Sequence, residues 1–420
     1  MKLRVSCGAL LALAVWTGRV QAQSQAGFIP FQNFIAGVRS TTAGNAAIEE
    51  MRQHILTMYQ GVEVTHSFVL ESHFDCVPVE QQPSVRLLGI ASISSPPPAS
   101  IPTADGDNGS DGAVSLTSQF DNAAALDPYG NSVRCEAGTI PMRRITLEDM
   151  SAFGTLQQYF QKSPGESLPG AVSPAADSHK YSYTYQGVNN VGGNSNLNLW
   201  SPAVDTASGE IFSLSQEWYS GGNGSKTQTA EVGWQNYPAM WGSQNSALFV
   251  YWTADDYNKT GCYNLTCPGF VQTDNSWTLG AGFPNYSVPG GAQYEFSAEY
   301  YFHGGDWWLA VGGTWIGYFP GSIYRGGQLS RHAQTIEFGS EGVGSTLWPP
   351  EGSGQWSTAG VNYAAYQRKL FYIKPSTANH APDILTPEQP SPACYSIDGP
   401  LKKSGWGVYF YLGGPGGSGC

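Results

Sequence analysis

The sequence predicts a mainly β protein, in which an antiparallel β-sandwich is preceded by a smaller α+β region. The chain of 420 residues has 52 Gly and 13% aromatic residues against 12% charged residues. This composition is typical of turn-rich β-structure and argues against a helical bundle, a coiled coil or a charged disordered chain. Apolar residues recur at every second position from residue 178 onward, whereas two patterns of helical spacing lie earlier.

The first 22 residues predict a signal peptide. Lys2 and Arg4 precede an unbroken apolar run at residues 10–16, and residues 20–22 place small side chains before a cut at Gln23. The alternative, a membrane anchor, would need about 20 apolar residues, and neither this run nor a later one reaches that length. We therefore expect a soluble product that is secreted to the extracellular space and has no membrane association.

Residues 23–177 form the smaller region of this prediction. A first helix is expected after the turn-forming residues 41–45, because five apolar residues then share one helical face: Ile48, Met51, Ile55, Met58 and Tyr59. A second helix is expected to start at Thr146, which with Asp149 resembles a capping box, and to bury four apolar residues: Met150, Phe153, Leu156 and Phe160.

Two stretches of low apolar content divide the chain further. Residues from about 92 to 112 are mainly Ser, Pro, Asp and Gly, which predicts a disordered loop. Residues from about 163 to 177 have a similar composition and predict a linker to the β-domain at residues 178–420.

The β-domain is predicted from short alternating runs separated by turn residues. Tyrosines at positions 181, 183 and 185 alternate with Ser182 and Thr184. Similar runs occupy residues 212–218, 230–234, 248–252 and 294–302, and the run at 248–252 is apolar on both faces. Such runs at short intervals are typical of an antiparallel sandwich or barrel.

Cysteine usage fits an exported protein. Six cysteines remain after removal of the signal peptide, and an even number in such a chain predicts three disulfides among 15 arrangements. Sequence proximity favours the pairs Cys262–Cys267 and Cys394–Cys420, which leaves Cys76–Cys135 for the N-terminal region. Five N-glycosylation sequons are also present, starting at Asn108, Asn223, Asn258, Asn264 and Asn285.

Charge and motifs exclude several classes of function. The net charge is −12 and only 20 residues are Lys or Arg, so a basic surface for nucleic acid or an anionic membrane is not expected. The motifs of zinc peptidases, serine hydrolases, P-loop proteins and EF-hands are missing from the sequence. A GxGxxG match at residues 414–419 ends at the chain terminus with no helix after it. We therefore expect neither a cofactor nor a metal.

Carboxylates are the remaining candidates for chemistry. Glu231 alternates with Val232 and Trp234, so it faces the opposite side of its strand beside Gly233. Glu341 lies among small residues in the segment FGSEG at 338–342. Glu295 and Glu299 form a rival pair on one face of an aromatic strand. Alternation alone does not choose between the two pairs.

The segments that carry Glu231 and Glu341 resemble the neprosin family. The resemblance covers the β-domain in order, through AEVGWQNYP at 230–238, LFVYWTADDY at 248–257, KTGCYNLTCPGF at 259–270, GDWWL at 305–309, IGYFP at 316–320 and GVYFYLGGP at 407–415. Upstream, CEAGTIPMRR at 135–144 resembles the activation propeptide of the family. This resemblance implies that residues 23–177 are an activation propeptide region and that residues 178–420 are the catalytic domain.

The resemblance further implies a secreted glutamic endopeptidase that is made as a zymogen, is active in acid and cuts after proline. The catalytic pair then falls on Glu231 and Glu341, with Glu337 as the alternative if the register of the second motif differs. The expected partners are proline-containing polypeptide substrates and the chain's own propeptide, which acts as an intramolecular inhibitor. Trp234 and Tyr237 are candidate walls of a proline slot, although aromatic residues of a β-domain more often belong to its core.

Paired carboxyls suit amide hydrolysis on chemical grounds as well. Two carboxyls close together cannot both ionise cheaply, so one acts as a base for water while the other keeps its proton and donates to the oxyanion. Two other classes remain open: a carbohydrate-binding β-sandwich with aromatic stacking platforms, and a glycosidase with two carboxylates.

Overall fold

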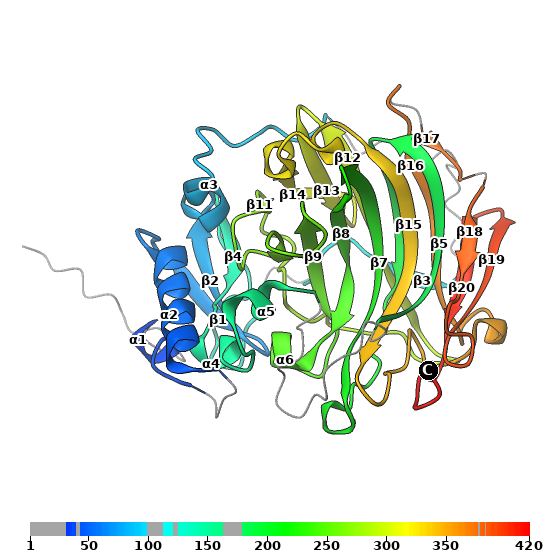
Figure 1. Cartoon of the computed structure of the whole chain (residues 1–420), viewed down its shortest axis with the longest axis horizontal. Helices are drawn as coiled ribbons and strands as arrows, with labels where there is room; N and C mark the ends of the chain where they lie inside the picture. The colour runs from blue at the N-terminus through cyan, green and yellow to red at the C-terminus, as the bar shows by residue number, and fades with distance from the viewer. Residues whose placement is uncertain are drawn as a thin grey trace, which may run out of the picture.

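A computed structural model describes residues 31–38, 43–98, 112–120, 125–162, 179–376, 379–382 and 384–420. In this part of the chain, a small α+β unit at residues 31–162 lies beside two large β-sheets (Figure 1). The predicted signal peptide, the end of the predicted loop and the predicted linker lie outside the described residues.

The α+β unit contains a three-stranded antiparallel sheet of order β1-β2-β4 and several helices. Its strands are β1 (His66–Val69), β2 (His73–Pro78) and β4 (Thr139–Arg143). Its helices are α1 (Phe31–Phe34), α2 (Asn45–Tyr59), α3 (Pro83–Leu87), α4 (Leu147–Met150) and α5 (Leu156–Phe160), with a 3₁₀ turn η1 at Val79–Gln81. Helix α2 confirms the first helical prediction, because Met51, Ile55 and Met58 are buried on one face.

The second helical prediction was wrong in its extent. Thr146 caps a helix as expected and accepts a hydrogen bond of 2.9 Å from the Asp149 backbone nitrogen, but α4 ends at Met150. A second short helix, α5, starts after Thr155, which accepts a hydrogen bond of 3.1 Å from the Gln158 nitrogen. Gly154 lies between the two helices, and glycine weakens a continuous helix.

One large sheet has seven strands in the order β10-β9-β8-β7-β15-β5-β18. Its strands are β5 (His179–Asn190), β7 (Glu210–Asn223), β8 (Lys226–Asn236), β9 (Ala247–Thr253), β10 (Cys262–Tyr263), β15 (Ala333–Gly344) and β18 (Thr386–Glu388). All of its pairings are antiparallel. A short helix, α6 (Pro238–Trp241), follows β8.

The other large sheet has ten strands, of which eight follow the order β11-β14-β13-β12-β6-β16-β20-β19, while β17 pairs with β16 and β3 with β12. The strands are β3 (Ala113–Leu116), β6 (Gly192–Asn198), β11 (Val271–Gln272), β12 (Gln293–His303), β13 (Asp306–Val311), β14 (Thr314–Pro320), β16 (Ala365–Ile373), β17 (Asn379–His380), β19 (Ser396–Lys403) and β20 (Gly407–Gly413). Short 3₁₀ turns lie at Thr206–Ser208, Gly321–Tyr324, Gln328–Ser330 and Ser357–Ala359.

The alternation read from the sequence matches the layers. Val232 and Trp234 on β8 belong to the large apolar core shared with the ten-stranded sheet, together with Leu248 on β9. The alternating positions Phe249 and Tyr251 on β9 belong to a second core, formed with the helices of the α+β unit. The seven-stranded sheet is therefore covered on both faces at β9. The chain is a mainly β, antiparallel β-sandwich, as predicted.

One strand of the N-terminal region joins the sandwich. Strand β3 pairs in parallel with Gln293–Phe296 of β12 and lies apart from β1, β2 and β4 in Figure 1. Residues 92–98 of the predicted disordered loop also contact the sandwich, where Ser94 Oγ donates 2.6 Å to Asp306 Oδ2. The sequence suggested a separate N-terminal unit and gave no sign of this strand.

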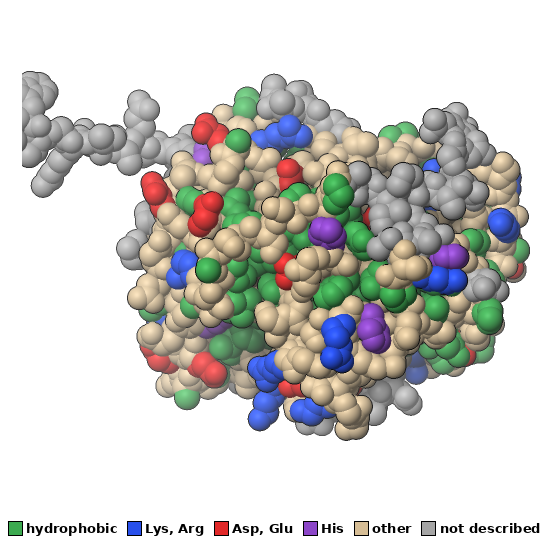
Figure 2. All heavy atoms as spheres, turned by 90° about the horizontal axis from the view of Figure 1, so that it is seen from above, with side chains coloured by type: hydrophobic (Ala, Val, Ile, Leu, Met, Phe, Trp, Pro, Cys, Tyr) green, Lys and Arg blue, Asp and Glu red, His purple; other side chains and the backbone are tan. Residues whose placement is uncertain are grey.

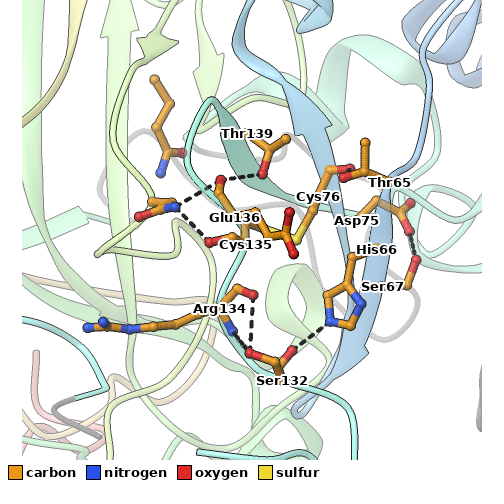
Figure 3. Close-up of a disulfide and its surroundings, with 12 residues drawn as sticks. Thr65, His66, Ser67, Asp75, Cys76, Ser132, Arg134, Cys135, Glu136 and Thr139 are labelled. Atoms are coloured by element: carbon orange, nitrogen blue, oxygen red, sulfur yellow. Dashed lines mark hydrogen bonds between the residues drawn. A yellow bond between two sulfur atoms is a disulfide. The ribbon is translucent and has the colours of Figure 1, made fainter. Parts of the chain in front are cut away.

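The three predicted disulfides are all present: Cys76–Cys135, Cys262–Cys267 and Cys394–Cys420. The pair Cys262–Cys267 closes a short loop, because the two cysteines are five positions apart in the sequence. Figure 3 shows the bond between Cys76 and Cys135, close to which His66 Nε2 lies 2.8 Å from the Ser132 carbonyl oxygen.

The predicted sequons differ in accessibility. Asn223, Asn258 and Asn285 are exposed, whereas Asn264 is only 4% exposed and its Oδ1 accepts 2.9 Å from the Val250 nitrogen. Asn264 is therefore a poor acceptor for a glycan in the folded protein, and Asn108 lies outside the described residues. Glycosylation itself stays a prediction.

The surface is sparsely charged. On the face seen in Figure 2, acidic and basic side chains are scattered among uncharged ones, and hydrophobic side chains show in the hollows. In the ranges that the structure describes, none of the helices combines the length and apolar character needed to cross a membrane.

Candidate active site

Glu231 lies on the face of β8 that is turned away from the ten-stranded sheet. Its side chain is fully buried. Thr229 Oγ1 and Tyr257 OH donate hydrogen bonds of 2.7 and 2.9 Å to Glu231 Oε1. Both neighbours are neutral hydrogen-bond donors.

Glu341 reaches the same place from β15, two strands away across β7. It is 1% exposed, and its Oε1 contacts His179 Nδ1 at the start of β5. Burial by itself would raise the pKa of Glu341, but the charges of Lys162 and His179 and their hydrogen bonds lower it to about 2.

Lys162 joins the two glutamates. Its Nζ lies 2.6 Å from Glu231 Oε2 and 3.1 Å from Glu341 Oε2, so these two oxygens can be no more than 5.7 Å apart. Burial alone would lower the pKa of Lys162, but the two carboxylates outweigh this effect and hold its pKa above the ordinary value. The structure thus brings the two predicted glutamates together, with a lysine of the N-terminal region between them.

A cavity of about 440 Å³ opens beside this pair. It is lined by Gln161, Lys162, His179, Tyr181, Tyr183, Gln216, Trp218, Tyr257, Glu337 and Glu341. Tyr183 and Trp218 form an aromatic wall, with ring centroids 5.7 Å apart. The wall candidates named from the sequence lie elsewhere, because Trp234 belongs to the inter-sheet core and Tyr237 to the core under the N-terminal helices.

Glu337 is a third carboxyl of the cavity. It lies on β15, and its Oε2 accepts a hydrogen bond from Ser220 Oγ. Burial raises the pKa of Glu337 to about 7, and the charge of Glu231 adds to this effect. Glu337, the alternative to Glu341 in the sequence prediction, therefore also lines the cavity. Of these two residues, it is Glu341 that forms the ion pair with Lys162.

The rival pair from the sequence lies outside this cavity. Glu295 is buried in an ion pair with Arg368, whose Nε lies 2.8 Å from Glu295 Oε2. Its pKa is lowered, because the hydrogen bonds and charge of Arg368 outweigh the effect of burial. Glu299 is also buried. Both members of the rival pair are therefore buried away from the cavity, and the carboxylate of Glu295 is held in an ion pair with Arg368.

Three residues of the site were missed in the sequence. Lys162 lies at the edge of the predicted linker, and His179 is one of four scattered histidines of the β-domain. Gln216 lies on β7 and accepts 2.9 Å from Lys162 Nζ. Each is brought to the site by strand pairing or by packing between distant segments. Only for Gln216 could the sequence have indicated the face, because it alternates with its neighbours in step with Leu214 and Trp218.

Comparison with known proteins identifies the family. The neprosin family model matches residues 209–415, which include both Glu231 and Glu341. Two paired carboxyls in a cavity are a kind of site that several hydrolases use. The chain belongs to the neprosin family, and this membership supports a peptidase.

Two solved structures were also found, both of scytalido-glutamic peptidase. The crystal structure with a transition state analog inhibitor is 7% identical, with a TM-score of 0.31 over 56% of this chain and 98% of that chain. The structure with a peptide based transition state analog is 8% identical, with the same TM-score over 57% and 98%. Similarity at this level carries no information on the mechanism of this chain.

Proposed function

We propose that this chain is an exported glutamic endopeptidase, made in a latent form, that hydrolyses peptide bonds after proline with Glu231 and Glu341 as its catalytic pair. The observation that carries the proposal is the single lysine ammonium held between two buried carboxylates beside a cavity. A site that holds two buried negative charges at one point is costly to build for stability alone.

The pair has the chemistry that amide hydrolysis needs. Without the lysine, two carboxyls whose oxygens lie within 5.7 Å share their titration, and one keeps its proton to a higher pH than the other. The ionised member takes a proton from water as it attacks the carbonyl carbon, and the protonated member donates to the carbonyl oxygen. Activity then requires a pH at which the pair holds one proton, which is an acidic pH.

Latency follows from Lys162. Its ammonium neutralises both carboxylates and occupies the position that water and the scissile carbonyl would need. Residues 31–162 are thus well placed to act as an intramolecular inhibitor, as the family resemblance implies for the activation propeptide. The predicted signal peptide at residues 1–22 supports secretion of this latent form.

Proline preference is supported by the aromatic wall. A pyrrolidine ring has no hydrogen-bond donor, so it is best recognised by flat apolar surfaces. Tyr183 and Trp218 offer such surfaces within the same cavity as Glu341.

The test uses the glutamine variants of both glutamates. Glu231→Gln and Glu341→Gln should each lower the cleavage of a denatured proline-rich protein at about pH 3 by about 100- to 10,000-fold. Glu388→Gln on the edge strand β18 serves as the control and should retain activity. New C-termini that end in proline, identified by mass spectrometry, establish the specificity. Full activity of either catalytic variant would remove that residue from the mechanism.

A glycosidase is the second candidate, because the two carboxyls of retaining glycosidases lie about 5 Å apart and the nearest oxygens of Glu231 and Glu341 lie within 5.7 Å. A carbohydrate-binding sandwich could use the same aromatic wall. The same incubation separates these classes, since hydrolysis or retention of a glycan without fragmentation of the protein would contradict the peptidase.

A further inference from the structure

We propose that Gln216 is a third catalytic group of this site, whose side-chain amide donates a hydrogen bond to the tetrahedral oxyanion once Lys162 has left. This inference rests on the proposed peptidase function and adds a residue that neither the sequence motifs nor the family match indicated. Gln216 is 2% exposed and lines the cavity.

Strand register places Gln216 between the two glutamates. It lies on β7, the strand that separates β8 and its Glu231 from β15 and its Glu341. Gln216 is directly opposite Gly233 on β8 and Gly339 on β15. Because neither glycine has a side chain, Gln216 is the one residue of these three paired positions that carries a side chain.

Both glycines are required by close contacts. A Cβ on Gly233 would lie 2.0 Å from the Ser215 carbonyl oxygen, and a Cβ on Gly339 would lie 2.4 Å from the Tyr183 Cβ. Distances of this size exclude any larger residue without movement of the backbone. Of these three paired positions, only Gln216 can therefore carry a side chain without movement of the backbone.

The lysine ammonium marks a point that all three groups can reach. Lys162 Nζ lies 2.6 Å from Glu231 Oε2, 2.9 Å from Gln216 Oε1 and 3.1 Å from Glu341 Oε2. A position about 3 Å from a base and from hydrogen-bond donors is where the atoms of a reacting carbonyl are expected. After the ammonium leaves, the reacting centre of a substrate can occupy the same position.

The amide can present its donor to that centre. With Lys162 in place, the carbonyl oxygen of the amide faces the ammonium, while in the described part of the chain the Gln216 Nε2 donates to no protein group. The terminal torsion of glutamine is broad and roughly two-fold, so a half-turn exchanges the oxygen for the nitrogen at little cost.

The backbone beneath this side chain is held in place from the other sheet. Gln367 on β16 is fully buried, and its Nε2 donates 3.0 Å to the Gln216 carbonyl oxygen and 3.2 Å to the Gly339 carbonyl oxygen. It also donates 2.9 Å to Ser215 Oγ. One side chain thus ties β7 to β15 at the level of Gln216, which preorganises the donor.

Hydrolysis of the peptide bond then proceeds through a tetrahedral intermediate. A water oxygen bonds to the carbonyl carbon, its proton passes to the ionised glutamate, and the carbonyl π electrons move to oxygen. That oxygen accepts hydrogen bonds from the protonated glutamate and from Gln216. When the C–N bond breaks, the C=O bond forms again and the leaving amine takes a proton from a glutamate.

The test compares Gln216→Ala with wild type, both cut within residues 163–178 and assayed at the same acid pH, so that the two proteins differ only at Gln216. We expect kcat to fall about 100- to 1,000-fold with KM little changed, as for loss of one oxyanion donor. Because an amide does not titrate, the pH profile set by Glu231 and Glu341, with Glu337 and His179 beside them, should keep its midpoints.

A matched variant separates this effect from misfolding. Gln235→Ala removes another buried glutamine of the same sheet, whose Nε2 donates 3.0 Å to Tyr263 OH, and should leave kcat within a few-fold of wild type. Gln216→Met, which keeps the side-chain volume, should lose activity as Gln216→Ala does, with a thermal midpoint close to wild type.

The outcomes distinguish this inference from the proposed function. Activity of Gln216→Ala within a few-fold of wild type, with both glutamate variants inactive, would overturn the role of Gln216 and leave the peptidase intact. A loss of activity with shifted pH midpoints would also overturn it, because Gln216 would then act through the pKa of the pair. Active glutamate variants would overturn the peptidase mechanism itself.

Discussion

The N-terminal region contacts the sandwich in two places that differ in chemistry. At its C-terminal end, Lys162 enters the cavity and forms ion pairs with two buried carboxylates. Some 46 residues earlier, strand β3 adds its backbone to β12 of the opposite sheet. The first contact depends on protonation and the second on neutral hydrogen bonds, so acid can release one without the other.

Neutral contacts of the second kind are numerous. Gln82 and Gln272 exchange two hydrogen bonds of 2.8 Å, from Gln82 Nε2 to the Gln272 carbonyl oxygen and from the Gln272 nitrogen to Gln82 Oε1. Gln119 Nε2 donates 2.8 Å to the Ala281 carbonyl oxygen. The disulfide Cys76–Cys135 connects the segments on either side of β3, so these anchors belong to one covalent unit.

Of the changes considered, removal of the Lys162 side chain should have the largest effect on the contact between the N-terminal region and the cavity. Lys162→Ala leaves two buried carboxylates without a counter-charge, which costs about 3–5 kcal/mol and favours withdrawal of the segment that covers them. We expect the uncut variant to cleave peptides at acid pH under conditions where uncut wild type is inactive. The measurement is the initial rate with a proline-containing peptide, before any chain cleavage is visible on a gel.

Lys226→Ala is the control for this variant, because Lys226 is exposed on the same sheet. The control should stay as latent as wild type. If uncut Lys162→Ala is also inactive while its cleaved form is active, then another contact of the N-terminal region maintains latency.

Acid alone should have a smaller and local effect. The pKa of Glu341 is about 2 with Lys162 and His179 beside it, against an ordinary value of 4.5. Because the bound-state pKa is depressed, the contact stabilises the closed form fully above about pH 4.5 and loses this contribution as the pH falls toward 2. Hydrogen exchange of the α5 segment should therefore rise in that window.

Strand β3 provides the internal reference in the same exchange experiment. Amides of Ala113–Leu116 should keep their protection through the same pH range, because backbone pairing with β12 does not titrate. Equal loss of protection in both segments would show that the N-terminal region opens as a whole, contrary to this comparison.

Cutting the linker should have the smallest effect. A site for a specific protease placed within residues 163–178 would separate the chain into two parts, but β3 and the glutamine contacts remain. We expect the two parts to elute together in size-exclusion chromatography at pH 7 and to separate in denaturant. Elution of a free N-terminal part at pH 7 would mean that the covalent link, rather than β3, holds the region in place.

The fold and the meeting of Glu231 with Glu341 were largely accessible from the sequence, and the contact of Lys162 with both glutamates was not. Alternation around Glu231 gave the correct face of β8, and the resemblance chose Glu341 over the buried, ion-paired Glu295. Lys162 follows a short helix in a region with no β-pattern, so nothing local indicated that it reaches a strand about 70 residues later.

Strand β3 escaped prediction for a related reason. It has four residues, which is too short for a period-2 pattern to be distinguished from chance, and its partner β12 is about 180 residues away. Such a short strand forms because a strand of the sheet, here β12, offers backbone groups for it to pair with. The break between α4 and α5, by contrast, could have been read from Gly154.

The segment between Lys162 and His179 begins and ends at the same pair of carboxylates, since Lys162 contacts both and His179 contacts Glu341. Its sequence contains Pro164, Pro169 and Pro174. A substrate tethered at both ends is present at a high effective concentration that dilution does not change. Self-cleavage of this segment would therefore be a first-order event within each molecule, with a half-time that does not depend on the concentration of the protein.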